Sequence, residues 1–145
     1  CEARYKAYVA APSVTYFNKI DQLWTLYEYE TGAFKLPEND GANMIYGGCN
    51  CGNCHITISS NGDIMACRRV TDSKVANIFE DRLADVWISQ MEKYREYDKF
   101  AKCSKCELKA WCRGCPAVAN GTVGDFYGAD PQCWKTKNNI TGEEL

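Results

Sequence analysis

The sequence predicts a small α+β domain, in which a β-hairpin and helices accompany irregular, cysteine-rich chain organised around metal. Three observations carry this prediction. Nine of the ten cysteines lie between residues 49 and 133. Residues 55–66 alternate apolar and polar side chains around an Asn-Gly pair, which is typical of a hairpin. Apolar residues recur at helical spacing before and after that stretch, which predicts helices.

The composition limits what the chain is expected to bind. A length of 145 residues suits one domain, and the formal net charge of −2 gives no basis for nonspecific binding to nucleic acid. The sequence has no apolar run long enough to span a membrane and no signal-peptide pattern. Disulfide frameworks belong to small secreted chains that lack a sufficient core, whereas the apolar helix patterns here supply one. We therefore expect a reducing, cytoplasmic setting, with neither nucleic acid nor membrane as a partner.

Residues 1–47 are expected to lead into the cysteine-rich region. Residues 5–10 alternate weakly between polar and apolar side chains, which predicts a strand. From Tyr16 onward, helical spacing predicts a helix that stops near Gly32. The apolar positions of this helix are Phe17, Ile20, Leu23, Trp24 and Tyr27. Because the chain begins with Cys1 rather than Met, we interpret residues 1–47 as the tail of a preceding domain.

The hairpin of residues 55–66 is expected to position two cysteines. Asn61-Gly62 supplies the turn between its strands. The two strands would bring Cys54 and Cys67 to the same end, as a shared metal site requires.

A second helix is expected after the hairpin, with Asn77 or Asp81 as its N-cap. The apolar face of this helix consists of Leu83, Val86, Trp87, Met91 and Tyr94. Residues 102–133 are rich in Gly and Cys and poor in apolar side chains, so their order is expected to depend on bound metal.

The cysteines in residues 102–133 are spaced for metal binding. Cys103 and Cys106 form one Cys-x2-Cys pair, and Cys112 and Cys115 form a second pair five residues later. Thiolates bind soft metals, and short loops let backbone N–H groups point at sulfur, which suits a zinc tetrathiolate and an iron–sulfur cluster alike. Zinc ribbons usually keep their pairs farther apart. Cys133 is a fifth nearby thiol, so we expect that one of the five serves a neighbouring site.

Short motifs around the cysteines occur in a fixed order over residues 48–135. They are Asn61-Gly62-Asp63, Asn77-Ile78, Cys112-Arg113-Gly114-Cys115, Gly124-Asp125 and Asp130-Pro131-Gln132-Cys133. Together with the order Cys-x12-Gly-x4-Cys from Cys49 to Cys67, these motifs resemble the SPASM domain. That domain is the C-terminal extension of radical S-adenosylmethionine enzymes that modify ribosomally made peptides and some tetrapyrroles.

The resemblance implies two auxiliary 4Fe–4S clusters with interleaved ligands, around which the α+β fold would be organised. The ligands implied for the first cluster are Cys49, Cys54, Cys67 and Cys115. Cys51 is the alternate to Cys49, because Cys49, Cys51 and Cys54 offer three thiols for two positions. The ligands implied for the second cluster are Cys103, Cys106, Cys112 and Cys133. The resemblance assigns no catalytic residue to this segment.

The resemblance also implies a catalytic partner. The catalytic cluster of these enzymes needs Cys-x3-Cys-x2-Cys, which this sequence lacks. S-adenosylmethionine and a third 4Fe–4S cluster are therefore expected in a radical S-adenosylmethionine barrel, N-terminal in the same parent chain. That domain would abstract hydrogen from a peptide substrate, and the clusters of this segment would carry electrons away as the peptide is crosslinked or oxidised. Residues 136–145 are expected to form a C-terminal tail.

Two alternatives stay open at the level of sequence. A zinc-stabilised interaction module with no redox chemistry would use the same thiols. An auxiliary domain of a tetrapyrrole-modifying enzyme would keep the clusters and change the substrate. Visible absorption separates the first alternative, because zinc thiolates are colourless and 4Fe–4S clusters are brown.

Overall fold

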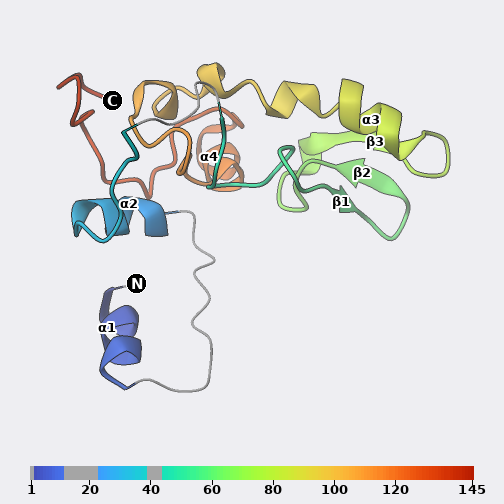
Figure 1. Cartoon of the computed structure of the whole chain (residues 1–145). Coiled ribbons are helices and arrows are strands. Elements are labelled where there is room, and N and C mark those ends of the chain that lie inside the picture. Colours follow the sequence, from blue (N-terminus) through green and yellow to red (C-terminus); the bar gives the residue numbers. More distant parts are fainter. Residues whose placement is uncertain (1, 12–22, 39–43) are drawn as a thin grey trace.

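A three-stranded antiparallel sheet forms one end of the molecule, and the cysteine-rich loops follow it (Figure 1). The computed structural model describes residues 2–11, 23–38 and 44–145. The strands are β1 (Thr57–Ile58), β2 (Asp63–Met65) and β3 (Lys74–Asn77), in the order β1-β2-β3. The expected hairpin is therefore confirmed, with Ile58 opposite Ile64. The third strand was not expected, and it pairs with β2 through an irregular register.

Four α-helices accompany the sheet in the described part of the chain, so the expected α+β class is confirmed. They are α1 (Glu2–Ala10), α2 (Trp24–Glu30), α3 (Leu83–Ser89) and α4 (Pro116–Val123). Short 3-10 turns connect α3 to the cysteine-rich loops. Among the described residues, no helix combines the length and the apolar character that crossing a membrane requires.

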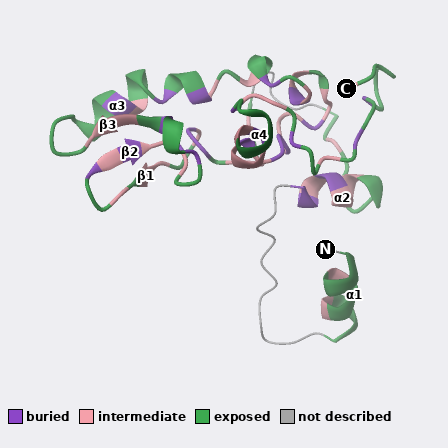
Figure 2. Cartoon of the chain, turned by 180° about the vertical axis from the view of Figure 1, so that it is seen from behind, coloured by how far each residue is buried: buried purple, intermediate pink, exposed green. Residues whose placement is uncertain are grey.

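The expected strand at residues 5–10 is wrong, because this segment is part of helix α1. Six of the nine residues of α1 are good helix formers, and Lys6 pairs with Glu2 one turn earlier at 2.6 Å. No residue of α1 is buried (Figure 2). The weak alternation of apolar residues therefore reflected no buried face.

The helix expected from Tyr16 is observed only in its last part, as α2. Its predicted positions Phe17 and Ile20 lie outside the described residues. The expected stop is confirmed, because Thr31 caps the helix and Gly32 has a left-handed φ of 75°.

The second expected helix is confirmed as α3, but it is shorter than its apolar pattern. It ends at Ser89, and Met91 and Tyr94 reach the core from the following chain. The expected caps are wrong: Arg82 precedes the helix in an extended conformation, with no side-chain cap. Asn77 instead ends β3, and its N–H donates to the Asp81 carboxylate at 3.0 Å.

Two apolar clusters support the cysteine-rich region. The first lies between the sheet, α3 and the loop around Phe126, and it includes Cys51 and Cys103. The second includes Cys112 and packs Leu108 against Leu26 of α2. Each apolar cluster thus contains at least one buried cysteine, so the packing of apolar side chains limits the contact of these thiols with water.

The hairpin turn provides a first test of the fold. Gly62 has a φ of +85°, and a Cβ there would lie 2.6 Å from the Phe79 ring and 2.7 Å from the Asn77 side chain. We expect Gly62→Ala to destabilise the chain by about 2 kcal/mol, since both the backbone conformation and the space oppose a side chain. Chemical denaturation followed by circular dichroism measures this change.

Gly121 provides the matched control for this substitution. It lies in α4, and a Cβ added to it would have no other atom within 4 Å. Gly121→Ala should stabilise the chain by roughly 0.5–1 kcal/mol, because alanine favours the helix. Equal effects of the two substitutions would contradict the described turn.

Candidate metal centre

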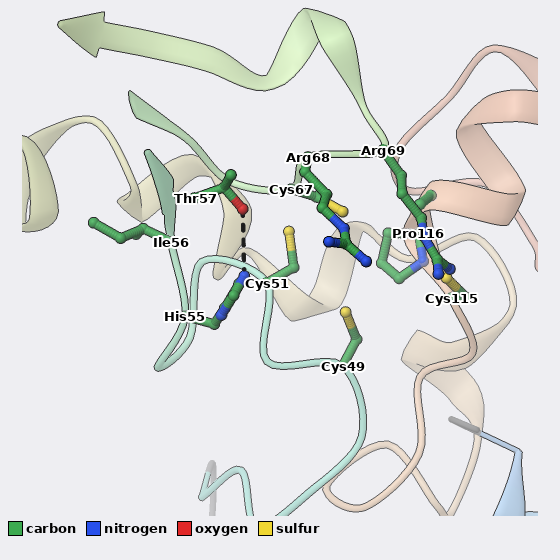
Figure 3. Close-up of a pocket in the computed structure, with 11 residues that line it drawn as sticks. Cys49, Cys51, His55, Ile56, Thr57, Cys67, Arg68, Arg69, Cys115 and Pro116 are labelled. Atoms are coloured by element: carbon green, nitrogen blue, oxygen red, sulfur yellow. Dashed lines mark hydrogen bonds between the residues drawn. The ribbon is translucent and has the colours of Figure 1, made fainter. Parts of the chain in front are cut away.

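Four cysteines from three separate segments line one cavity of about 550 Å³ (Figure 3). Cys49 and Cys51 come from the loop before β1, Cys67 follows β2, and Cys115 directly precedes α4. We call Cys49, Cys51, Cys67 and Cys115 the first thiol group. Arg68 and Arg69 also line this cavity, so positive charge lies beside the thiols (Figure 3).

A tight turn decides which cysteines of the first loop face the cavity. The Asn50 carbonyl accepts hydrogen bonds from the N–H groups of Asn53, Cys54 and His55, at 3.0, 3.2 and 3.0 Å. This turn buries Cys51, whose Sγ donates to the Ala66 carbonyl at 3.0 Å. Cys54 is exposed and is not among the residues that line the cavity.

Cys49 and Cys51 are electrostatically unequal. A hydrogen bond from the Cys51 side chain lowers the pKa of Cys49 to about 6. The same contact, together with burial, raises the pKa of Cys51 well above its ordinary value. Because the thiolate is the form that binds metal, the lowered pKa favours Cys49 as a ligand, and a bound cation would offset the raised pKa of Cys51.

A second set of thiols lies in the C-terminal loops. Cys103 interacts electrostatically with the other three thiols of this set, Cys106, Cys112 and Cys133. We call these four residues the second thiol group. Burial raises the pKa of Cys103 to about 12 and that of Cys106 to about 11, and burial also raises the pKa of Cys112. Burial thus disfavours the thiolate forms, and a bound metal would supply the positive charge that ionises them.

Backbone N–H groups point at three of the sulfurs. Cys49 accepts a hydrogen bond from the N–H of Cys51, Cys106 from that of Leu108, and Cys112 from that of Gly114. In each case the donor lies two residues after the cysteine. Such bonds stabilise negative charge on sulfur, as expected for short loops between metal-binding thiolates.

The four thiols of the first thiol group fit a four-iron cluster in which each iron has one cysteine ligand. Among residues 2–11, 23–38 and 44–145, no three Cys, His, Asp or Glu side chains converge on a position for one metal ion. The first thiol group instead surrounds a cavity (Figure 3). A zinc tetrathiolate needs four sulfurs about 2.3 Å from one point, whereas a 4Fe–4S cluster needs four thiolates around a larger volume.

The turn from Cys112 to Cys115 joins the two thiol groups. Asp130 holds this turn: it is 4% exposed, and its carboxylate accepts the N–H of Cys115 at 2.8 Å. Gly114, with a φ of +61°, lets the turn approach Asp130, because a Cβ there would lie 2.7 Å from the Asp130 Cβ. The Asp130 carbonyl accepts the N–H of Cys133 at 3.0 Å. Asp130 therefore positions one cysteine of each group.

Comparison with known proteins identifies the domain that carries these thiols. Residues 49–116 match the family model of SPASM, an iron–sulfur cluster-binding domain. This segment is a SPASM domain. The resemblance derived from the cysteine spacing is thus confirmed. The matched segment contains all the cysteines implied as ligands except Cys133.

Two relatives are similar to this chain over a region longer than the SPASM segment. Both are named AdoMet-dependent heme synthase. The protein from Nitratidesulfovibrio vulgaris is 27% identical over 108 residues, which cover 72% of this chain and 29% of the relative. The protein from Oleidesulfovibrio alaskensis is 28% identical over 109 residues, which cover 72% of this chain and 27% of the relative. The chain thus spans less than a third of the length of these relatives. Comparison with solved structures finds no match.

The SPASM segment and the chain after it also contain buried polar residues whose roles the sequence did not indicate. Arg113 is 2% exposed, and Glu107 and Lys135 form an ion pair with both side chains buried. Arg113 and Asp130 belong to the sequence motifs on which the resemblance rests. The sequence did not show which residues they contact. Cys1 lies outside the described residues.

Proposed function

We propose that this chain is the auxiliary iron–sulfur domain of a radical S-adenosylmethionine oxidoreductase and binds two 4Fe–4S clusters. The observation that carries this proposal is the pair of four-thiol groups, joined by the turn from Cys112 to Cys115. Clusters bound by four thiolates each supply one-electron transfer. The chain's own residues bury part of the thiol surface, donate N–H groups to three of the sulfurs and place Arg68 and Arg69 beside the first group.

The ligands of the first cluster are proposed to be Cys49, Cys51, Cys67 and Cys115. These four cysteines line one cavity, which supports Cys51 in the position that the resemblance gave to Cys54. The ligands of the second cluster are proposed as the resemblance implied, namely Cys103, Cys106, Cys112 and Cys133. Their mutual electrostatic contacts support this set.

Cys51 and Cys54 form a matched pair for testing the first ligand set. We expect Cys51→Ala to lower the iron content from roughly eight to roughly four per chain, because one four-iron cluster is lost. Cys54→Ala should leave the iron content unchanged, since Cys54 is exposed outside the cavity. Iron analysis of the anaerobically reconstituted variants measures both. Loss of iron from Cys54→Ala alone would restore the ligand set implied by the resemblance.

The catalytic partner is proposed to be a radical S-adenosylmethionine domain of the same parent chain. The names of both relatives specify dependence on AdoMet, and those proteins are several times longer than the matched region. The SPASM match supports the same partner. A reducing, cytoplasmic setting remains a prediction.

The substrate has two candidates. A ribosomally made peptide is the substrate that the sequence motifs favoured, and it stays a prediction. A tetrapyrrole is favoured by the names of both relatives, which are heme synthases. Incubating the parent enzyme with S-adenosylmethionine and each class of substrate distinguishes them through the product formed.

The electron-carrying role is tested in the parent enzyme with its catalytic domain present. Cys67→Ala removes a proposed ligand of the first cluster and leaves the catalytic domain untouched. We expect cleavage of S-adenosylmethionine to continue while formation of the oxidised substrate stops. Unchanged substrate turnover in Cys67→Ala, with the first cluster lost, would contradict the proposed role of that cluster.

A further inference from the structure

Arg113 is a buried cation with no carboxylate partner among the described residues. It is 2% exposed. Its guanidinium donates to the carbonyls of Lys109 and Cys49, at 3.0 and 2.9 Å, and lies over the Tyr97 ring at 4.9 Å from the centroid. These contacts satisfy hydrogen bonds but supply no negative charge. A buried charge is costly unless an opposite charge compensates it.

The groups able to compensate Arg113 are thiolates of both thiol groups. Its guanidinium donates to the carbonyl of Cys49 of the first group, and Arg113 directly follows Cys112 of the second group in the chain. In the chain, Arg113 occupies the turn that joins the two groups. Metal-bound cysteines are deprotonated, so each occupied site places negative charge beside Arg113.

We infer that Arg113 is a fixed positive charge shared by the two cluster sites and raises the reduction potential of each. This inference rests on the proposed function. Reduction adds one electron, and hence one negative charge, to a cluster. A nearby positive charge in a water-poor site favours the reduced form. Arginine stays protonated throughout the working pH range, so its contribution is constant.

The test compares Arg113→Met with Arg113→Lys in the full chain, reconstituted anaerobically. Redox titration followed by electron paramagnetic resonance gives the midpoint potential of each cluster. We expect Arg113→Met to shift both potentials to more negative values. Arg113→Lys, which keeps the charge, should remain close to the wild type. Potentials unchanged in Arg113→Met, with both clusters present, would overturn the inference.

Arg95 serves as the control for loss of packing and hydrogen bonds. Like Arg113, it donates to two carbonyls, those of Gly52 and Trp87, and lies over an aromatic ring. It is more exposed than Arg113 and is not on the turn that joins the groups. Arg95→Met should therefore change the potentials less than Arg113→Met does. Equal shifts would overturn the inference.

Two further outcomes are decisive. If Arg113→Met loses its clusters but Arg113→Lys keeps them at wild-type potentials, the charge is required and the inference holds. If both variants lose their clusters, Arg113 acts through the hydrogen bonds that its guanidinium donates to the carbonyls of Lys109 and Cys49, and the inference fails. Failure of the proposed function looks different, because the wild-type chain would then hold no cluster to titrate.

Discussion

Cys115→Ala is expected to remove the first cluster and leave the second one intact. In the sequence, Cys115 belongs to the Cys-x2-Cys pair that begins at Cys112. In the structure, it lines the cavity with Cys49 and Cys67 instead. Iron content should therefore fall from roughly eight to roughly four per chain, with one set of cluster signals lost.

Cys112→Ala is the matched substitution, three residues earlier in the same turn. It should remove the other cluster, because Cys112 interacts with Cys103 and Cys133. Electron paramagnetic resonance of the reduced variants distinguishes the two remaining clusters. If both substitutions abolish the same signals, the two cysteines share one site and the interleaved arrangement is wrong.

Lys135→Met is expected to cause a large loss of stability, because it breaks a buried ion pair. Lys135 pairs with Glu107 at 3.0 Å, and the two side chains are 5% and 2% exposed. Burial raises the pKa of Glu107, but the Asn139 N–H and Lys135 lower it below its ordinary value, so the carboxylate is ionised at neutral pH. Removing the lysine leaves this charge buried and unpaired, which costs about 3–5 kcal/mol.

The exposed pair between Lys137 and Glu144 supplies the control. These side chains are 61% and 72% exposed and meet at 3.2 Å. Lys137→Met should cost less than about 1 kcal/mol, because water screens the pair. Anaerobic urea denaturation of the reconstituted chain measures both variants. A loss for Lys135→Met no greater than that for Lys137→Met would show that the pair is not buried in solution.

Two local features, the hairpin and the N–H groups that point at sulfur, could be predicted from sequence. The hairpin follows from local turn chemistry at Asn61-Gly62, and the N–H groups that point at sulfur follow from short loops. Both features depend on residues that are close in the chain. The same reasoning located α3 from its apolar spacing, although the helix ends before the pattern does.

The features that sequence missed depend on contacts between distant residues. Strand β3 has only four residues, and it is recognised as a strand through its pairing with β2. That Cys51 lines the cavity while Cys54 is exposed follows from three N–H groups that share the Asn50 carbonyl, which cysteine spacing does not reveal. Likewise, the inference about Arg113 depends on its burial and on its hydrogen bond to the Cys49 carbonyl, 64 residues earlier in the chain.

The central claim is that the chain binds two 4Fe–4S clusters, and metal analysis tests it most directly. We would measure iron, acid-labile sulfide and zinc in the anaerobically purified, reconstituted chain, together with its visible spectrum. Two clusters predict roughly eight irons and eight sulfides per chain, with a brown chromophore. Near-stoichiometric zinc that survives reconstitution, without visible absorption, would contradict the claim and leave a structural zinc module.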